Sequence, residues 1–109
     1  MARSEVLDRL FEVVEARRRE RPPGSYVVSL LEAGRPALAA KLREETEELI
    51  EAAAGDDPAH TAAEVADLLF HGWVLMAEAG VSPADVYAVL EARFGIGGLV
   101  EKAGRTDAG

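Results

Sequence analysis

The sequence predicts an all-α protein, built as an antiparallel bundle of about five helices. Apolar residues recur at helical spacing along most of the chain, and the polar–apolar alternation of half-buried strands is missing throughout. Prolines, glycines and capping residues interrupt this pattern, and the short connections that they mark favour antiparallel neighbours. The 109 residues are enough for one domain with one hydrophobic core.

The first two helices are predicted from apolar spacing and from the residues that end it. Apolar side chains recur at helical spacing over about 5–19, and the stretch 21–24, with two prolines and a glycine, ends that helix. Ser25 is a suitable cap for a short helix that runs to about Glu32 and stops at Gly34.

Two longer helices follow. Pro36 suits the first turn of a helix that runs to about Ala54 and is closed by Gly55. Asp57 then caps a helix that ends at Gly80. Because the connection between them is short, we expect these two helices to lie antiparallel.

The last predicted helix opens with a capping motif. Ser82 is the cap, Pro83 occupies the first turn, and Asp85 completes a start that resembles a capping box. This helix is predicted to end at Gly95. The chain is therefore divided into an all-α domain at 1–95 and a glycine-rich C-terminal tail at 96–109.

Composition excludes several classes of function. Hydrophobic residues make up 49% and charged residues 29% of the chain, which is ordinary for a folded globular protein. The formal net charge of -8 disfavours nucleic-acid binding, because no basic stripe offsets the acidic residues. With no cysteine, there is no disulfide, no thiolate metal site and no cysteine nucleophile. No signal peptide or membrane-spanning run is recognisable, so we expect no membrane association and a cytoplasmic location.

The candidate site is a pattern of paired carboxylates on two predicted helices. Glu45 and Glu48 are separated by three residues, as are Glu64 and Asp67, and residues so spaced are neighbours on a helix surface. Four acidic side chains on facing helices would repel one another and lose hydration unless a cation lay between them. Mg²⁺ prefers oxygen ligands and often binds a few carboxylates together with substrate phosphates. The pattern therefore predicts a metal-dependent enzyme acting on a phosphorylated compound.

Helical geometry places these carboxylates close to apolar surface. On the helix 36–54, steps of about 100° per residue give an apolar stripe, with Glu45 beside it and Glu48 next to it. The stripe consists of Leu38, Leu42, Leu49 and Ala53. Glu47 and Glu51 turn to the far side, where we expect solvent. The helix 58–80 is apolar around almost its whole circumference, so it is predicted to be buried nearly all round. Its polar stripe consists of Glu64, Asp67, His71 and Glu78.

Two simpler interpretations compete with a metal site. Glu64 and Asp67 could form a buried ion pair, for which Lys41 is the well-placed lysine of the two in the chain. His71 could be a satisfied core histidine, or it could support the site or contact substrate.

The same residues resemble a known family. The pattern Glu44-Glu45-x-x-Glu48, followed by Glu64-x-x-Asp67, is similar to the signature of the all-α nucleoside triphosphate pyrophosphatases, the MazG-like superfamily. More specifically, the chain resembles the phosphoribosyl-ATP pyrophosphatase family of histidine biosynthesis over nearly its whole length. The narrower resemblance rests on the turn 23–26, the run 66–71 and the tail 94–105.

The resemblance implies hydrolysis of 1-(5-phosphoribosyl)-ATP to 1-(5-phosphoribosyl)-AMP and pyrophosphate, with Mg²⁺ as cofactor. It also implies a homodimer, which would supply the extra cover that a helix apolar all round requires. The chain departs from the family pattern at Val27, where threonine is frequent, at Arg43, where glycine is frequent, and at Gly97 and Gly104, where serines are frequent. Val27 would remove a hydroxyl from the substrate pocket, whereas Arg43 should point away from the acidic face.

The roles that we assign follow from this resemblance and from the helical spacing. We expect the metal ligands to be Glu45, Glu48, Glu64 and Asp67. Glu44, together with Glu45 and Glu48, is assigned to catalysis, because Glu44 lies one residue from the chelating pair and is a candidate to orient the attacking water or act as base. The candidates for substrate binding are Ser25, Tyr26, Lys41, His71, Lys102 and Arg105.

Two other functions remain open from the sequence. One is a house-cleaning pyrophosphatase that acts on other nucleoside triphosphates through the same metal site. The other is a non-catalytic dimeric helical module, whose acidic residues pair with basic residues of a partner and bind no Mg²⁺.

Overall fold

The structure, a computed structural model, describes residues 2–94 and is helical throughout. A 3₁₀ turn at Arg3–Glu5 precedes five α-helices, and no strand occurs in the range 2–94. The helices are α1 (Val6–Glu20), α2 (Tyr26–Ala33), α3 (Arg35–Ala54), α4 (Pro58–Glu78) and α5 (Pro83–Ala92). The predicted all-α class is confirmed. The tail at 96–109 lies outside the described residues, as does the predicted end of the last helix at Gly95.

The predicted capping residues occupy the helix starts. The Ser25 hydroxyl accepts a hydrogen bond from the Val28 amide at 3.3 Å, and an Asp57 carboxylate oxygen accepts one from the Ala59 amide at 3.1 Å. At α5 both halves of a capping box form between Ser82 and Asp85. These bonds satisfy amide groups that a helix start leaves without a partner, so local chemistry fixes where α2, α4 and α5 begin.

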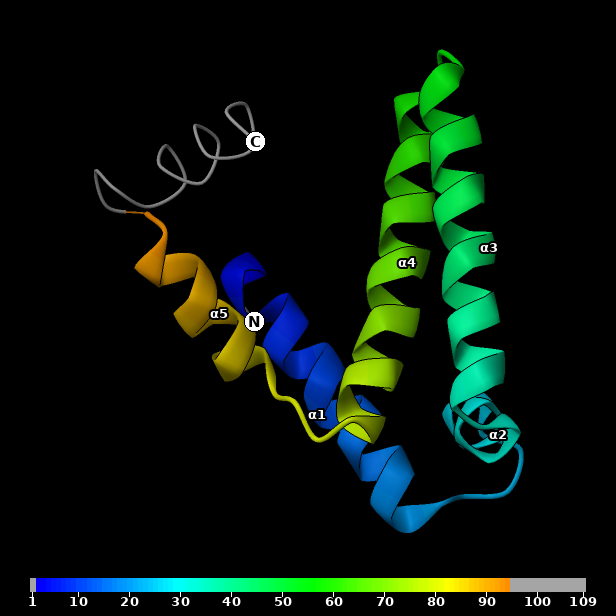
Figure 1. The fold of residues 1–109 in the computed structure, drawn as a ribbon, viewed down its shortest axis with the longest axis vertical. Coiled ribbons are helices and arrows are strands. Elements are labelled where there is room, and N and C mark those ends of the chain that lie inside the picture. Colours follow the sequence, from blue (N-terminus) through cyan, green and yellow to red (C-terminus); the bar gives the residue numbers. More distant parts are fainter. Residues whose placement is uncertain (1, 95–109) are drawn as a thin grey trace.

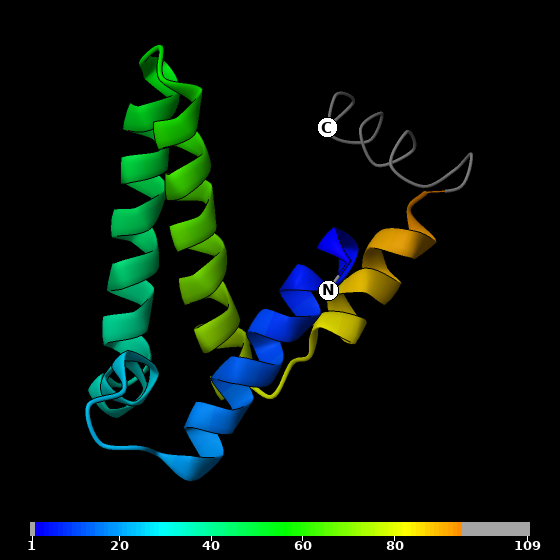
Figure 2. The same ribbon diagram turned by 180° about the vertical axis from the view of Figure 1, so that it is seen from behind.

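The helices form a tall hairpin on a broader base. In Figures 1 and 2, α3 and α4 lie side by side along their whole length, and α2 lies beneath α3. Helix α1 crosses near the C-terminal end of α4, and α5 packs along α1. The radius of gyration is 16.3 Å, compared with about 13 Å for a compact domain of about 100 residues. The single chain is therefore elongated. None of the helices in the range 2–94 is long and apolar enough to cross a membrane.

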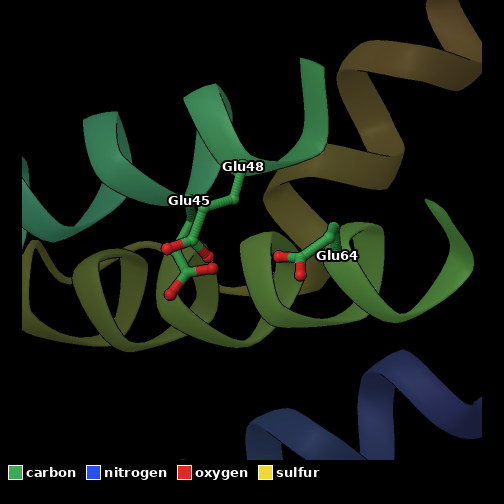
Figure 3. A group of neighbouring side chains, drawn as sticks. All are labelled: Glu45, Glu48 and Glu64. Carbon is green, nitrogen blue, oxygen red and sulfur yellow. The ribbon is translucent and has the colours of Figure 1, made fainter. Parts of the chain in front are cut away.

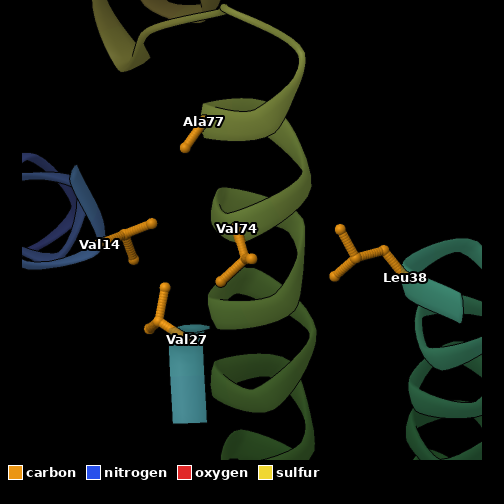
Figure 4. Packing of buried hydrophobic residues seen from close by; sticks show 5 residues of the cluster. All are labelled: Val14, Val27, Leu38, Val74 and Ala77. Atoms are coloured by element: carbon orange, nitrogen blue, oxygen red, sulfur yellow. The ribbon is translucent and has the colours of Figure 1, made fainter. Parts of the chain in front are cut away.

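The apolar core lies where α1, α2, α3 and α4 meet. It consists of Val14, Val27, Leu38, Val74 and Ala77, which point toward one another from four helices (Figure 4). The Trp73 indole N–H, just above this core, donates a hydrogen bond to the Leu7 carbonyl at 2.9 Å and ties α4 to α1. An ion pair between Arg35 and Glu78 joins the start of α3 to the end of α4. The base of the hairpin is thus held from several sides.

One line of buried residues runs up α3. Leu38, Glu45 and Ala52 are seven residues apart and are the buried residues of this helix, which we call the buried line of α3. A seven-residue repeat keeps one face of a helix against a neighbour that winds around it, as in coiled coils. The predicted apolar stripe included Ala53, which is exposed, and this detail was wrong because Ala52 continues the seven-residue line.

The prediction that α4 is buried nearly all round is wrong for the single chain. Its C-terminal half is buried through Trp73, Val74 and Ala77, because α1 and α2 cover it there. In the upper half, however, Val65 is 38% exposed, and Ile50 on α3 is 57% exposed. Apolar surface therefore remains uncovered on the upper part of the hairpin.

Candidate metal centre between α3 and α4

Three carboxylates converge between the two helices of the hairpin. Glu45 and Glu48 project from successive turns of α3, and Glu64 projects toward them from α4 (Figure 3). One carboxylate oxygen from each residue lies within 4.8 Å of the others. We call these residues the acidic cluster. The i,i+3 spacing on α3 and the antiparallel pairing with α4 together bring them to one place, as the sequence predicted.

The acidic cluster lacks enough partners of its own. Glu45 is only 4% exposed, and Oε2 of Glu45 and Oε2 of Glu64 are both buried without a hydrogen-bond partner in the described part of the chain. A buried carboxylate oxygen without a partner loses its hydration and receives nothing in return. A hard divalent cation with oxygen ligands would supply the missing interaction, so the residues present fit Mg²⁺.

Lys41 neutralises only part of this charge. Its Nζ lies 3.4 Å from Glu45 Oε1 and 3.6 Å from Glu44 Oε1. Burial alone would lower the pKa of Lys41, but the hydrogen bond to Glu45 and the charges of Glu44 and Glu45 raise it above its ordinary value. The lysine therefore stays charged. Within residues 2–94, no lysine or arginine forms an ion pair with Glu48 or Glu64, so the simpler interpretation that Lys41 pairs with Glu64 is not what the structure shows.

The proton affinity of Glu48 reflects the same crowding. Burial is the largest effect that raises its pKa above the ordinary value, followed by the negative charges of Glu45 and Glu64. The negative charge of Glu44 raises this pKa further, and so does the hydrogen bond that a protonated Glu48 can donate to Glu45. Like charges in one place each disfavour ionisation of the others, and a bound cation removes that penalty.

Beside the acidic cluster, a tyrosine and a histidine are bonded to each other. The Tyr26 hydroxyl lies 2.8 Å from Nε2 of His71, and Nδ1 of His71 lies 2.7 Å from the carbonyl oxygen of Asp67. Nδ1 is also 3.8 Å from Oε1 of Glu45. The Tyr26 ring stacks on Phe70, with ring centroids 5.9 Å apart. His71 thus contacts α2, α3 and its own helix at one point.

A cavity of about 440 Å³ lies against Tyr26. It is lined by the turn between α1 and α2, including Arg21, Ser25 and Ser29, as well as by Tyr26 itself. Ligand sites commonly have volumes of this order. Tyr26 therefore lines this cavity and also contacts His71.

Comparison with known proteins identifies the family. The sequence profile of the phosphoribosyl-ATP pyrophosphohydrolase family matches residues 7–94. A protein of Parvibaculum lavamentivorans named phosphoribosyl-ATP pyrophosphatase is 52% identical over 99 residues, which cover 91% of each chain. Proteins with the same name from Rhodopirellula baltica and Sulfurisphaera tokodaii are 48% and 44% identical. The Rhodopirellula match covers 91% of this chain and 85% of its relative, and the Sulfurisphaera match covers 84% and 97%. The chain belongs to the phosphoribosyl-ATP pyrophosphohydrolase family. The predicted family and the predicted hydrolase class are therefore confirmed.

Not every residue that we assigned to the site of this pyrophosphohydrolase lies in the acidic cluster. Asp67 is exposed and contributes its backbone carbonyl to His71, while its carboxylate is outside the group of three. Glu44 is exposed beside Lys41. Ser25 caps α2 at the edge of the cavity. The roles of these residues stay predictions, and Lys102 and Arg105 lie outside the described residues.

The structure also explains one departure from the family pattern. The Val27 side chain packs in the apolar core, so the missing hydroxyl at this position would face the core. Arg43 is exposed, as predicted, and so are Glu47 and Glu51.

Sequence reasoning missed His60 as a neighbour of the site. Its Nε2 lies 3.4 Å from Oε1 of Glu64, and His60 precedes Glu64 by one turn of α4. The i,i+4 spacing of His60 and Glu64 was the signal that could have found it.

Proposed function

We propose that this member of the family hydrolyses 1-(5-phosphoribosyl)-ATP to 1-(5-phosphoribosyl)-AMP and pyrophosphate, the second step of histidine biosynthesis. The substrate class is supported by the family match and by relatives named phosphoribosyl-ATP pyrophosphatase. The observation that carries the chemistry is the acidic cluster, in which two buried carboxylate oxygens have no hydrogen-bond partner among residues 2–94.

Mg²⁺ is the proposed cofactor, held by Glu45, Glu48 and Glu64. When bound, the ion would offset negative charge on the triphosphate and on the departing pyrophosphate. Asp67 lies next in line on α4 and is proposed as a further ligand or as a group that holds a ligand water. Its exposed position allows its side chain to turn toward a bound ion.

The neighbouring residues of the chain have complementary roles in this proposal. Glu44 is exposed at the edge of the cluster, where it would orient the attacking water or accept its proton. Lys41, which is charged and half-buried, would contact a phosphate oxygen. Ser25 and Tyr26 line the cavity that would receive the rest of the substrate.

We further propose that the chain acts as a homodimer. Ile50 and Val65 are exposed on the upper part of the hairpin, and the single chain is elongated. A symmetric partner that packs there would bury this apolar surface. The cytoplasmic location stays a prediction from the sequence.

An assay of phosphoribosyl-ATP hydrolysis with and without Mg²⁺ tests the function. We expect pyrophosphate release that depends on Mg²⁺ and exceeds that from a panel of ordinary nucleoside triphosphates. Replacing Glu48 or Asp67 with alanine should abolish turnover and leave the helical circular-dichroism signal intact. Glu51→Ala is the matched control, since Glu51 is an exposed glutamate on the same helix as Glu48.

The rival functions give different results in the same experiment. Faster hydrolysis of ordinary nucleoside triphosphates would identify a house-cleaning pyrophosphatase instead. If calorimetric titration detects no Mg²⁺ binding and no substrate is hydrolysed, the chain is a non-catalytic module and the proposal is wrong. Full Mg²⁺-dependent activity in Glu48→Ala would refute its assignment as a ligand.

A further inference from the structure

For a neutral His71 ring, the direction of its bond with Tyr26 follows from the hydrogen bond that the other ring nitrogen makes. The atom opposite Nδ1 of His71 is the Asp67 carbonyl oxygen, at 2.7 Å, and a carbonyl can only accept a hydrogen bond. Nδ1 therefore carries a proton and donates it. In a neutral imidazole the other nitrogen, Nε2, then has a lone pair and no proton. With the ring neutral, the Tyr26 hydroxyl at 2.8 Å is the donor in the second bond.

In this arrangement the hydroxyl proton of Tyr26 points toward Nε2 of His71. Its oxygen keeps lone pairs that can only accept hydrogen bonds from the other side. The ring itself is held by stacking on Phe70 and by its edge contact with the His71 ring, so the oxygen has a defined position. Although the hydroxyl is bonded to a buried histidine, Tyr26 as a residue is 51% exposed and lines the cavity of about 440 Å³.

We propose that His71 is a positioning residue that holds Tyr26 as a hydrogen-bond acceptor, and that Tyr26 thereby selects substrates with a sugar hydroxyl at this point. The Tyr26 oxygen contacts Nε2 of His71, and Nδ1 of the same ring is 3.8 Å from the Glu45 carboxylate. A group bound at Tyr26 is thus close to phosphates bound at the acidic cluster, as a ribose is close to its own phosphates. The inference rests on the proposed function, since it concerns how the same site recognises a nucleotide.

The tautomer of His71 is the first test, and it needs no substrate. The ¹⁵N chemical shifts of the two ring nitrogens, measured at about pH 8 where an ordinary imidazole is neutral, should show Nδ1 protonated and Nε2 unprotonated. Because the chain has only two histidines, the variant His60→Gln assigns the signals. An Nε2-protonated ring would overturn the proposal, whether or not the protein hydrolyses phosphoribosyl-ATP.

Two substitutions of His71 separate its two nitrogens. In His71→Gln the side-chain amide reaches the place of Nε2 and can still accept from Tyr26, whereas in His71→Asn it reaches only the place of Nδ1. We expect Tyr26→Phe and His71→Asn to raise KM for phosphoribosyl-ATP by about 3- to 10-fold, the value of one neutral hydrogen bond, with a smaller change in kcat. His71→Gln should stay closer to wild type, and Tyr87→Phe on α5 is the matched tyrosine control.

Substrate analogues test the selected group directly. Two analogues of phosphoribosyl-ATP are used, one without the 2′ hydroxyl and one without the 3′ hydroxyl of the adenosine ribose. For wild type, we expect one of the two to have a KM that is raised by a similar factor. That analogue should lose nothing further in Tyr26→Phe or His71→Asn, and should still be discriminated by His71→Gln. Equal discrimination in wild type and Tyr26→Phe would overturn the proposal. If no variant hydrolyses phosphoribosyl-ATP, wild type included, the proposed function fails, and the ring tautomer alone decides the positioning of Tyr26.

Discussion

The lower and upper parts of the hairpin use the same buried line of α3 for opposite purposes. At Leu38 the line enters the apolar core, where side chains from four helices surround it. At Glu45, two turns higher, the line is equally closed to solvent, yet it carries a carboxylate with a partnerless oxygen. The geometry of the backbone is the same at both places, and the difference lies in the side chains and in what covers them.

This contrast shows where the chain gains stability and where it gives stability up. Burying apolar surface stabilises the base of the hairpin by about 25 cal/mol per Å². Burying like-charged carboxylates in the upper part destabilises the fold until a cation binds. A chain selected for stability alone would continue the apolar pattern upward, so the interruption at Glu45 is the mark of a functional site.

The largest expected effect is on the lower part. Leu38→Ala removes a side chain that is 1% exposed at the meeting point of the helices. The lost contacts and the remaining cavity should lower the free energy of unfolding by about 2–5 kcal/mol. Urea denaturation measures this change. Leu90→Ala on α5, where the side chain is 41% exposed, is the control and should cost much less.

A second substitution makes the upper part resemble the lower part. Glu45→Leu continues the apolar line through the acidic cluster and removes one of its three negative charges. Replacing buried charges by apolar side chains of similar volume is often stabilising by about 1–4 kcal/mol. In buffer without divalent ions we therefore expect a higher free energy of unfolding together with loss of Mg²⁺ binding in calorimetry.

Loss of stability in Glu45→Leu would contradict this account, because it would mean that the contacts of Glu45 with Lys41 and His71 outweigh its buried charge. Glu47→Leu, at an exposed position on the same helix, is the control for the change in helix propensity and hydrophobicity.

Much of this contrast could be predicted from the sequence. Apolar spacing and capping residues gave five helices with starts close to the observed ones, because both act locally. The convergence of Glu45, Glu48 and Glu64 also followed from spacing. Local spacing could not show that Asp67 lies outside the group of three, because the twist of α4 against α3 decides which turn of α4 faces Glu48.

The contacts of Tyr26 were beyond prediction for a related reason. Tyr26 and His71 are 45 residues apart, and their bond depends on how α2 docks beneath α3 and α4. The exposure of the upper part of α4 was also missed, because the apolar circumference of a helix indicates how much cover it needs and not which chain provides it.

The outer surface of the upper part provides a third test. Val65→Glu places a charge on apolar surface that we propose a second copy covers, and it should weaken the dimer by about 10-fold or more, as for a central interface residue. Analytical ultracentrifugation over a range of concentrations measures the dissociation constant. Val6→Glu, at an exposed valine at the start of α1, is the control. A Val65→Glu protein that dimerises as wild type does would place the interface elsewhere.

The smallest expected effect concerns α5, which contacts α1 and lies away from both parts of the hairpin. The Ser82 backbone amide donates to Asp85 at 2.9 Å and is the largest cause that lowers the pKa of Asp85 below its ordinary value of 3.8. The Ser82 hydroxyl adds to the same effect. A lowered pKa in the folded state means that the ionised carboxylate stabilises the fold above pH 3.8 and that this contribution is lost as the pH falls through the lowered value.

Asp85→Asn should therefore unfold more easily than wild type at about pH 6, and the difference should shrink as the pH falls below 3.8. Thermal unfolding at several pH values measures it, with Glu91→Gln, an exposed position on the same helix, as the control. Since α5 contacts α1 and, among the described elements, neither helix of the hairpin, Mg²⁺ affinity should not change with this substitution. A loss of Mg²⁺ affinity in Asp85→Asn would mean that α5 supports the acidic cluster. In that case α5 would belong with the functional upper part of the hairpin.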